Sequence, residues 1–391
     1  MENFIYDIPT KVYFGKGQLQ QLHTIMKEFG ERVLLVYGGG SIRRNGIYDE
    51  AVTELHTAGK KYVELFGVEP NPSLTTVEKG VALCRRENVD VIVAIGGGSV
   101  IDCAKVVSAA VCSTLSPWEL VLHPQEIKKA IPVIAVLTIA ATGSEMDHIA
   151  VITNPDTKEK IGTRNPLLRP RAAILDPTFT FSVNRYQSAC GVADIMSHTM
   201  ESYFAREDAG LQNRFAEGIL KICTAYGPLV LKEPDNYEAR ANIMWAGTVA
   251  HNDIVGVGRS QDWNSHAIEH ELSGLYDCAH GAGLAVIMPA WMEFVYRHNI
   301  MRFAQAATRV WGCEMNFENP EETAVQGIKA FRRFLHDIGM PINFDELGAK
   351  EEDIPLMVEK LGLGEGKTGG FVSLSSGDVT EIFRIAAKAK L

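Results

Sequence analysis

The sequence predicts an α/β nucleotide-binding domain at residues 1–183, followed by an all-helical domain at residues 184–391. Three observations lead to this fold class. In the first half, short continuous runs of Val, Ile and Leu alternate with helical patterns, which is typical of a parallel sheet covered on both faces. After about residue 185, only helical patterns follow. The length of 391 residues also exceeds what one hydrophobic core usually serves.

The apolar runs place the strands of the sheet at residues 33–37, 62–66, 90–95, 131–137 and 172–175. Helices are expected between them at 47–58, 77–87 and 100–110. The second half is expected to hold helices at 188–206, 213–231, 239–252, 266–275, 283–298, 301–311, 320–338 and 379–387.

Composition excludes several classes of function. The formal net charge is −10, and nucleic acids and anionic membranes bind clustered Lys and Arg, so neither is expected as a partner. No apolar run reaches the roughly 20 residues of a membrane span, and the first residues lack the apolar core of a signal peptide. The seven cysteines form no CxxC pair, which favours a reducing compartment. We therefore expect a cytoplasmic protein.

One glycine-rich turn, Gly96-Gly97-Gly98-Ser99, follows an expected strand and opens a helix that carries Asp102 in its first turn. Glycines let the backbone approach a phosphate closely, and the N–H groups at a helix start attract negative charge. The turn is not a GxGxxG fingerprint, because Ile101 occupies the third glycine position, and no P-loop GK[ST] follows. It indicates either a pyrophosphate site or only a tight turn.

A second turn, Gly38-Gly39-Gly40-Ser41, ends the first long strand and precedes Arg43 and Arg44. In dinucleotide sites, an acidic residue at such a strand end holds the ribose 2′-OH, whereas small residues with a nearby Arg leave room for a 2′-phosphate. This turn therefore favours NADP(H). The alternative is a plain loop with solvated arginines.

Hydroxyl groups are concentrated in residues 138–145, which include Thr138, Thr142 and Ser144. Such a loop after a strand can line a cofactor or cap the following segment. Lys160 lies beyond it and, taken alone, would be interpreted as a surface lysine.

Histidines are concentrated in one short segment, since His266, His270 and His280 lie within fifteen residues. Asp194 and His198 are four residues apart in a helical pattern and share a face, as do His266 and His270. If these helices converge, a carboxylate and several imidazoles form a site suited to Zn²⁺ or Fe²⁺.

The same residues allow other interpretations. A solvated polar stripe on an amphipathic helix explains Asp194 and His198 without a ligand. Histidines also act as general acids and bases without a metal, or lie in a core with satisfied hydrogen bonds. The four-residue spacing does not by itself decide between these alternatives.

Taken in order, the motifs resemble the iron-containing (group III) alcohol dehydrogenase family, and most closely its branch of butanol dehydrogenases and NADPH-dependent aldehyde reductases. The resemblance extends from Tyr6 to the C-terminal helix, and the ordered set is specific although no single motif is. The motifs are Gly96-Gly97-Gly98-Ser99-Val-Ile-Asp102, Thr138…Thr142-Gly-Ser144-Glu, Gly191-Val-Ala-Asp194-Ile-Met-Ser-His198 and His266-Ala-Ile-Glu-His270…His280-Gly-Ala-Gly.

The resemblance implies the dehydroquinate synthase-like fold of that family, with an α/β nucleotide-binding domain and an all-helical domain. It implies a homodimer, one Fe²⁺ or Zn²⁺, and the metal ligands Asp194, His198, His266 and His280. Gly38 stands where NAD-dependent relatives carry Asp, so NADP(H) is the expected cofactor, with NAD(H) possible. The implied cofactor-binding residues are Gly38, Gly39, Gly40, Ser41, Gly96, Gly97, Gly98, Ser99, Asp102, Thr138, Thr142, Ser144 and Lys160.

The implied activity is hydride transfer between the nicotinamide and small primary alcohols or aldehydes such as butanol and butanal. The metal is expected to act as a Lewis acid. His270, which shares a helix face with His266, is expected to relay a proton. A glycerol dehydrogenase-like or dehydroquinate synthase-like enzyme is an alternative on the same fold. A nucleotide- and metal-binding sensor without turnover is an alternative of another class.

Overall fold

The structure, a computed structural model, describes residues 1–391 and contains two compact units. We call them the sheet unit, Asp7–Val183 with Pro234–Asn252, and the helical unit, Met1–Tyr6 with Asn184–Glu233 and Asp253–Leu391. The chain passes from one to the other at Val183, where the sequence placed the division between 1–183 and 184–391. The units differ from that expectation in two segments, because residues 1–6 belong to the helical unit and residues 234–252 to the sheet unit.

Six parallel strands form the sheet, in the order β1-β8-β5-β4-β2-β3. The central strands are buried because their residues are continuously apolar, as the sequence predicted. The edge strand β1 was not expected. The bounds are β1 Lys11–Phe14, β2 Arg32–Tyr37, β3 Lys61–Phe66, β4 Val91–Gly96, β5 Val133–Leu137 and β8 Ala172–Leu175.

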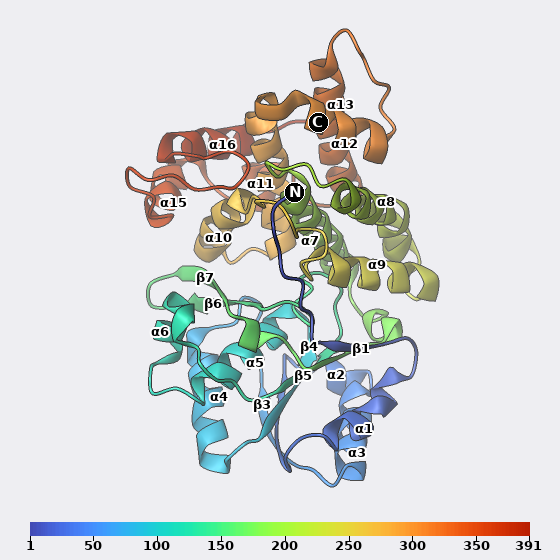
Figure 1. The fold of residues 1–391 in the computed structure, drawn as a ribbon, viewed down its shortest axis with the longest axis vertical. Coiled ribbons are helices and arrows are strands. Elements are labelled where there is room, and N and C mark those ends of the chain that lie inside the picture. The colour runs from blue at the N-terminus through green and yellow to red at the C-terminus, as the bar shows by residue number, and fades with distance from the viewer. The chain divides into compact units, whose positions relative to one another are not determined.

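Helices cover both faces of the sheet. In Figure 1, α1 and α3 lie on one side of the sheet and α4 on the other. Residues of α1 and α3 share one apolar cluster with the sheet, and residues of α4 and α5 share the other. The helices of the sheet unit are α1 Leu22–Met26, α2 Ser41–Arg44, α3 Ile47–Thr57, α4 Leu74–Glu87, α5 Gly98–Ala110, α6 Pro117–Leu122 and α9 Tyr237–Ala250.

An antiparallel hairpin, β6 Ile149–Asn154 with β7 Glu159–Arg164, follows β5 and was not predicted. The residues of β6 alternate between buried and half-buried positions, whereas those of β7 do not follow a strict alternation. The register places Lys160 opposite Thr153. Lys160 is only 9% exposed, so the interpretation of Lys160 as a surface lysine is wrong.

Helix α9 belongs to the sheet unit because its side chains pack there. Met244 lies in the apolar cluster that contains α4 and α5, and Trp245 meets Phe14 edge to face at 5.8 Å between ring centroids. Thr248 donates a hydrogen bond to Glu145. A helical pattern alone does not reveal which core a helix joins, so the sequence assigned this segment to the helical domain.

The helical unit contains every helix expected there except α9, with ends that differ by a few residues. It also contains two short helices that the sequence did not indicate, α14 and α15. The helices are α7 Arg185–Tyr203, α8 Gly210–Lys232, α10 Asn264–Tyr276, α11 His280–Val295, α12 Ile300–Trp311, α13 Pro320–Asp337, α14 Phe344–Leu347, α15 Ile354–Lys360 and α16 Ser376–Lys388.

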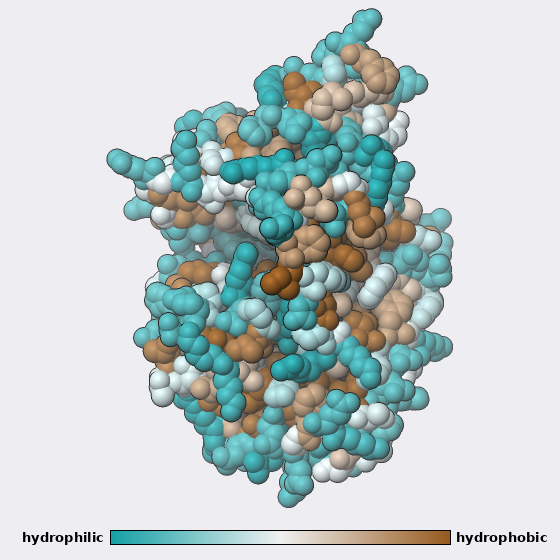
Figure 2. Space-filling model, viewed as in Figure 1, coloured by the Kyte–Doolittle hydropathy of each residue, from teal (hydrophilic) through white to brown (hydrophobic).

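The surface is mainly polar on the face that Figure 2 shows, with hydrophobic side chains scattered among charged ones. None of the helices combines the length and the apolar character that a membrane span requires. All seven cysteines are free thiols.

Candidate active site

Helix α7 places three acid or imidazole side chains on one face. Asp194, His198 and Glu201 are spaced four and three residues apart, so they follow one another along that face. Residues 188–203 of α7 are all buried. The alternative of a solvated polar stripe is therefore wrong, and these polar groups lie in the interior of the helical unit.

Helices α10 and α11 bring two histidines to this face. His266 lies in the first turn of α10, and His280 is the first residue of α11. Two glycines allow the start of α11 to approach so closely. A Cβ on Gly281 would lie 2.1 Å from the backbone oxygen of Cys190 in α7, and one on Gly283 would lie 2.4 Å from Glu269 Oε1.

Three histidine nitrogens surround one carboxylate oxygen. Asp194 Oδ1 lies 3.5 Å from His198 Nδ1, 3.9 Å from His266 Nε2 and 3.7 Å from His280 Nε2. Tetrahedral ligands with bonds of about 2.1 Å are about 3.4 Å apart, so these separations from Asp194 are compatible with one ion. The donor atoms of Asp194, His198 and His266 all lie within 4.8 Å of one another, and His280 approaches the same oxygen of Asp194. A carboxylate with imidazoles is a donor set for Zn²⁺ or Fe²⁺. The structure thus brings together the four expected ligands.

Two further carboxylates, those of Glu201 and Glu269, contact the imidazole nitrogens that point away from Asp194. Glu201 Oε2 contacts His266 Nδ1, and Glu269 Oε2 is hydrogen-bonded to His280 Nδ1. Glu201 is itself held by Ser265 Oγ and by the backbone N–H of His266 at 3.0 Å. Each carboxylate fixes the ring tautomer that directs Nε2 toward Asp194, an arrangement that strengthens metal binding.

The sequence did not assign a role to either glutamate. Glu201 lies seven residues after Asp194, on the same helix face, and Glu269 lies between the two histidines of α10. The helical spacing could have indicated Glu201. Nothing in the sequence shows that Glu269 turns toward His280, which lies on the next helix.

His270 lies at the edge of this cluster. Its ring centroid is 5.5 Å from that of His280 and 6.4 Å from that of His266, and it is more exposed than His266. Trp263 packs edge to face against His266 at 5.3 Å and covers the cluster from another direction. His270 is thus a solvent-accessible neighbour of the four expected ligands.

In the sheet unit, the two predicted glycine turns lie at the ends of adjacent strands. Tyr37 pairs with Ile95 in the register of β2 and β4, so the turns at 38–41 and 96–99 follow side by side. Both turns approach the Val100 side chain. A Cβ on Gly38 would lie 3.7 Å from Val100, and one on Gly96 would lie 2.4 Å from it. The two turns therefore lie close together at the carboxyl edge of the sheet.

The turn at 96–99 opens α5, which has thirteen residues and begins at Gly98. A Cβ on Gly98 would lie 2.5 Å from Thr142 Oγ1, so the turn packs directly against the loop that follows β5. Thr138 donates its backbone N–H to the backbone oxygen of Gly96 at 2.9 Å. Backbone N–H groups at such a helix start bind phosphate oxygens.

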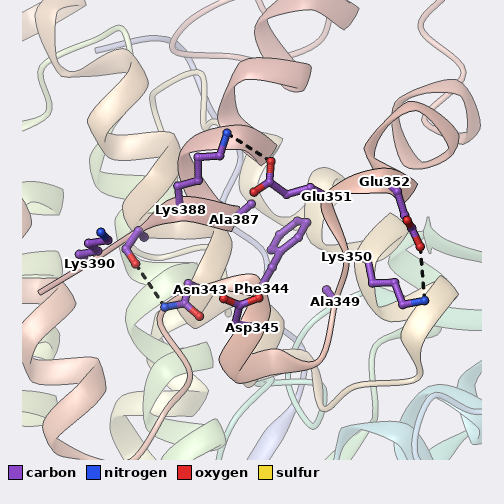
Figure 3. Close-up of a pocket in the computed structure, with 11 residues that line it drawn as sticks. Asn343, Phe344, Asp345, Ala349, Lys350, Glu351, Glu352, Ala387, Lys388 and Lys390 are labelled. Atoms are coloured by element: carbon purple, nitrogen blue, oxygen red, sulfur yellow. Dashed lines mark hydrogen bonds and ion pairs between the residues drawn. The ribbon is translucent and has the colours of Figure 1, made fainter.

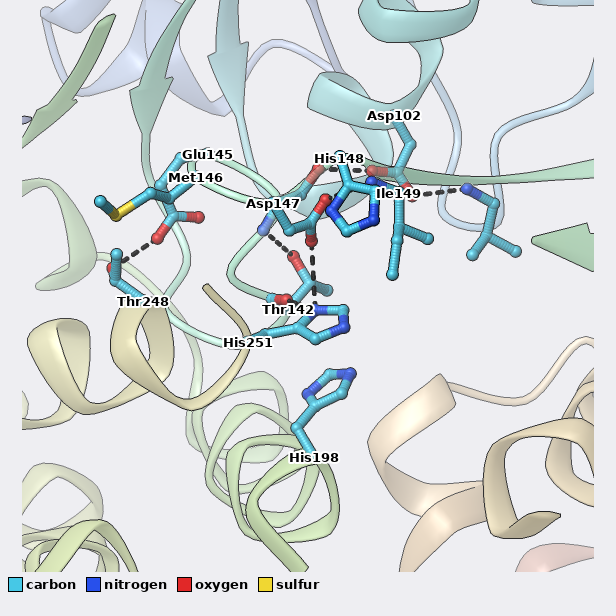
Figure 4. A network of polar contacts seen from close by, with 12 residues as sticks. Asp102, Thr142, Glu145, Met146, Asp147, His148, Ile149, His198, Thr248 and His251 are labelled. Atoms are coloured by element: carbon cyan, nitrogen blue, oxygen red, sulfur yellow. Dashed lines mark hydrogen bonds and ion pairs between the residues drawn. The ribbon is translucent and has the colours of Figure 1, made fainter. Parts of the chain in front are cut away.

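Asp102 connects this helix to neighbouring segments. Its carboxylate accepts hydrogen bonds from Ser144 Oγ at 2.5 Å and from the backbone N–H of Val151 at 2.9 Å (Figure 4). Burial raises the pKa of Asp102 to about 6, although the nearby Lys105 ammonium lowers it. Asp102 and Ser144, both expected to bind cofactor, thus bind each other and position the loop.

A buried ion pair supports the same loop. Lys105 is fully buried, and its Nζ donates to Asp147 Oδ1 and to the backbone oxygen of Ile149, both at 2.7 Å. His251 Nδ1 lies 3.1 Å from Asp147 Oδ2 and 2.8 Å from the backbone oxygen of Thr142 (Figure 4). Burial alone would raise the pKa of Asp147, but Lys105 and His251 hold it below its ordinary value.

The arginines after the first turn differ in their contacts. Arg43 donates to Glu64 Oε2 at 2.8 Å and stacks over the Tyr48 ring at 3.8 Å. Arg44 is exposed and forms no ion pair, and its Nη1 would lie 4.0 Å from a Cβ on Gly40. From the sequence, Arg43 and Arg44 were equal candidates for a contact with a 2′-phosphate, because the sequence does not show that Glu64 of β3 reaches Arg43.

A separate cavity of about 830 Å³ lies in the helical unit among α14, the segment before α15 and the C-terminus (Figure 3). Four of its charged side chains form two ion pairs, Lys388 with Glu351 at 3.3 Å and Lys350 with Glu352 at 3.4 Å. None of the expected site residues lines it. It is therefore distinct from the histidine cluster.

Two family models together match nearly the whole chain. The model described as iron-containing alcohol dehydrogenase matches residues 9–177, and the model of the C-terminal part of the Fe-containing alcohol dehydrogenase family matches residues 188–387.

Curated relatives and solved structures agree with the family models. The chain is 46% identical to NADH-dependent butanol dehydrogenase A of Clostridium acetobutylicum, over 98% of this chain and 99% of the relative. It is 38% identical to NADPH-dependent aldehyde reductase YqhD of Escherichia coli, over 92% and 93%. The crystal structure of NADH-dependent butanol dehydrogenase A from Thermotoga maritima superposes with a TM-score of 0.96 at 40% identity, covering 99% of both chains.

Proposed function

The chain belongs to the iron-containing alcohol dehydrogenase family, and from this premise we propose that Asp194, His198, His266 and His280 hold its one Fe²⁺ or Zn²⁺. The enzyme is an NAD(P)-linked alcohol dehydrogenase and aldehyde reductase. The observation that carries the ligand assignment is the position of three histidine nitrogens within 3.9 Å of Asp194 Oδ1. Small primary alcohols and aldehydes of the size of butanol and butanal are the proposed substrates.

The glycine turns and the loop after β5 are the proposed cofactor site. The N–H groups at the start of α5 would bind the pyrophosphate, with Thr138 and Thr142 lining the cofactor beside them. Lys160 is the remaining residue that we propose contacts the cofactor. Asp102 and Ser144 act in this proposal by holding the loop in place. Gly38 leaves the end of β2 without a carboxylate, so we propose that NADPH is accepted and preferred over NADH.

The protein's own part in the reaction is to fix the geometry of the site. When bound, the metal supplies Lewis acidity at a carbonyl oxygen, and the nicotinamide supplies the hydride. Glu201 and Glu269 hold His266 and His280 in the tautomers that keep their Nε2 atoms as acceptors. Trp263 covers the cluster and helps exclude water from it.

His270 is proposed to carry the proton between the substrate oxygen and solvent, because it adjoins the cluster and is partly exposed. We expect His270→Ala to lower kcat by about 100-fold, the range in which a positioned acid–base group contributes. Its metal content should stay at the wild-type value, since His270 is not a proposed ligand. A variant with wild-type kcat would contradict the relay.

The function itself is tested by following NADPH and NADH oxidation at 340 nm with an aldehyde series that includes butanal. We expect turnover with both cofactors, a higher kcat/KM with NADPH, and loss of turnover after chelation. A higher kcat/KM with NADH would overturn the proposed preference. No oxidation of either cofactor after reconstitution with Fe²⁺ or Zn²⁺ would favour the alternative of a sensor without turnover.

We also propose a homodimer in the cytoplasm. The dimer follows from the family resemblance, and light scattering of the purified protein measures it. A reducing compartment is consistent with seven cysteines that are all free thiols.

A further inference from the structure

Glu64 is an acidic residue near the first glycine turn that the proposed function leaves without a role. It lies on β3, which is hydrogen-bonded along its length to β2, the strand that ends at the turn. Beyond the strands, the backbone N–H of Gly67 donates to the backbone oxygen of Gly38 at 3.3 Å. The end of β3 is therefore fixed against the turn that carries the proposed 2′-phosphate site.

Three groups converge on the Glu64 carboxylate. Tyr37 donates its hydroxyl to Oε2 at 2.5 Å, Tyr48 donates to Oε1, and Arg43 donates to Oε2 at 2.8 Å. Burial alone would raise the pKa of Glu64, but these three partners hold it below its ordinary value. The carboxylate is thus ionised at neutral pH.

Arg43 is held by several members of this cluster, although about half of its side chain is exposed. Its guanidinium stacks over Tyr48 and also donates to the hydroxyl of Tyr37 at 3.2 Å. The contact with Glu64 is a single hydrogen bond from Nη2, and an Arg whose charge is paired with a carboxylate attracts a second anion less strongly. Arg44, one residue further, forms no ion pair and approaches the turn at Gly40.

We propose that Glu64 determines how strongly the enzyme prefers a 2′-phosphorylated cofactor, by holding Arg43 away from cofactor recognition. In this assignment, which rests on the proposed function, the uncommitted Arg44 recognises the 2′-phosphate and Arg43 does not contribute. Glu64 thereby limits the preference for NADPH over NADH that Gly38 permits, so that NADH remains usable as a cofactor.

The test measures nucleotide binding without turnover. Titration calorimetry gives the ratio of the affinities for adenosine 2′,5′-bisphosphate and for 5′-AMP, which differ only in the 2′-phosphate. As single substitutions, we expect Arg44→Gln to lower this ratio relative to wild type and Arg43→Gln to leave it unchanged. Glu64→Gln, which keeps an oxygen for the two tyrosines, should raise the ratio about three- to fivefold, as expected for one freed, half-exposed charge.

The double variant identifies the cause. If Glu64 acts through Arg43, the rise disappears in the Glu64→Gln, Arg43→Gln protein. A rise that persists there in full would overturn the proposal in favour of direct repulsion by Glu64. An unchanged ratio in Glu64→Gln, or a wild type that binds neither nucleotide, would also overturn it. Absence of aldehyde turnover with either cofactor would instead contradict the proposed function, because the binding ratio requires no turnover.

Discussion

Replacing His266 with Ala is expected to remove the metal and the activity together. His266 is buried, its Nε2 faces Asp194, and its Nδ1 contacts Glu201, so its truncation removes one proposed ligand from the cluster. Loss of a ligand should exceed the 10- to 100-fold effect of losing a supporting contact, and we expect kcat to fall by more than about 100-fold. Elemental analysis and the NADPH assay on one preparation measure both quantities.

Two further variants serve as comparisons, one with a smaller expected effect on the site and one as a control. Glu201→Gln should retain the ligands but weaken metal binding about 10- to 100-fold, because it removes the charge behind His266. His336→Ala, on α13 of the same unit, changes an exposed histidine and should keep the metal and the activity. An active His266→Ala protein with stoichiometric metal would refute the ligand assignment.

Replacing Lys105 with Met is expected to destabilise the sheet unit by about 3–5 kcal/mol. Lys105 is fully buried, and Asp147 would lose its principal countercharge while remaining buried. The backbone N–H of Ile149 at 2.7 Å and His251 at 3.1 Å would remain as partners of the carboxylate, without the full charge of the ammonium. Urea unfolding followed by circular dichroism measures the loss, and cofactor affinity should fall as well because the same pair supports the loop with Thr142.

The matched control for this substitution is Lys129→Met, which changes an exposed lysine of the same unit. Its effect should stay within about 0.5 kcal/mol. Adding Asp147→Asn to Lys105→Met should restore part of the lost stability, since no unpaired charge then remains in the core. A Lys105→Met protein as stable as wild type would contradict the importance of the ion pair.

Local patterns were sufficient for much of the fold. The central strands are continuous apolar runs, and helices were expected at 188–206 and 266–275, close to α7 and α10, so the existence and approximate bounds of these elements follow from the sequence. Strand β1 is a short edge strand, and its burial is only partial. In the hairpin, buried positions alternate along β6 but not along β7, and the turn contains Lys158 at φ +56°, where the sequence has no glycine to indicate a turn.

Contacts between distant segments could not be predicted in the same way. The sequence predicts an ordinary helix at residues 239–252, and only the packing of side chains such as Met244 and Trp245 places this segment in the sheet unit. The pairing of Glu64 with Arg43 joins β3 to α2, and that of Glu269 with His280 joins α10 to α11. In each case the sequence shows both groups but not the geometry that brings them together.

Reconstitution of metal-free protein tests the central claim most directly. The apoprotein, prepared anaerobically with a chelator, is titrated with Fe²⁺ and, separately, with Zn²⁺, while NADPH oxidation by butanal is followed. The proposed site predicts that activity is absent at the start, rises in proportion to added metal and stops rising at one equivalent per chain. Full activity in protein shown by elemental analysis to contain no metal would contradict it.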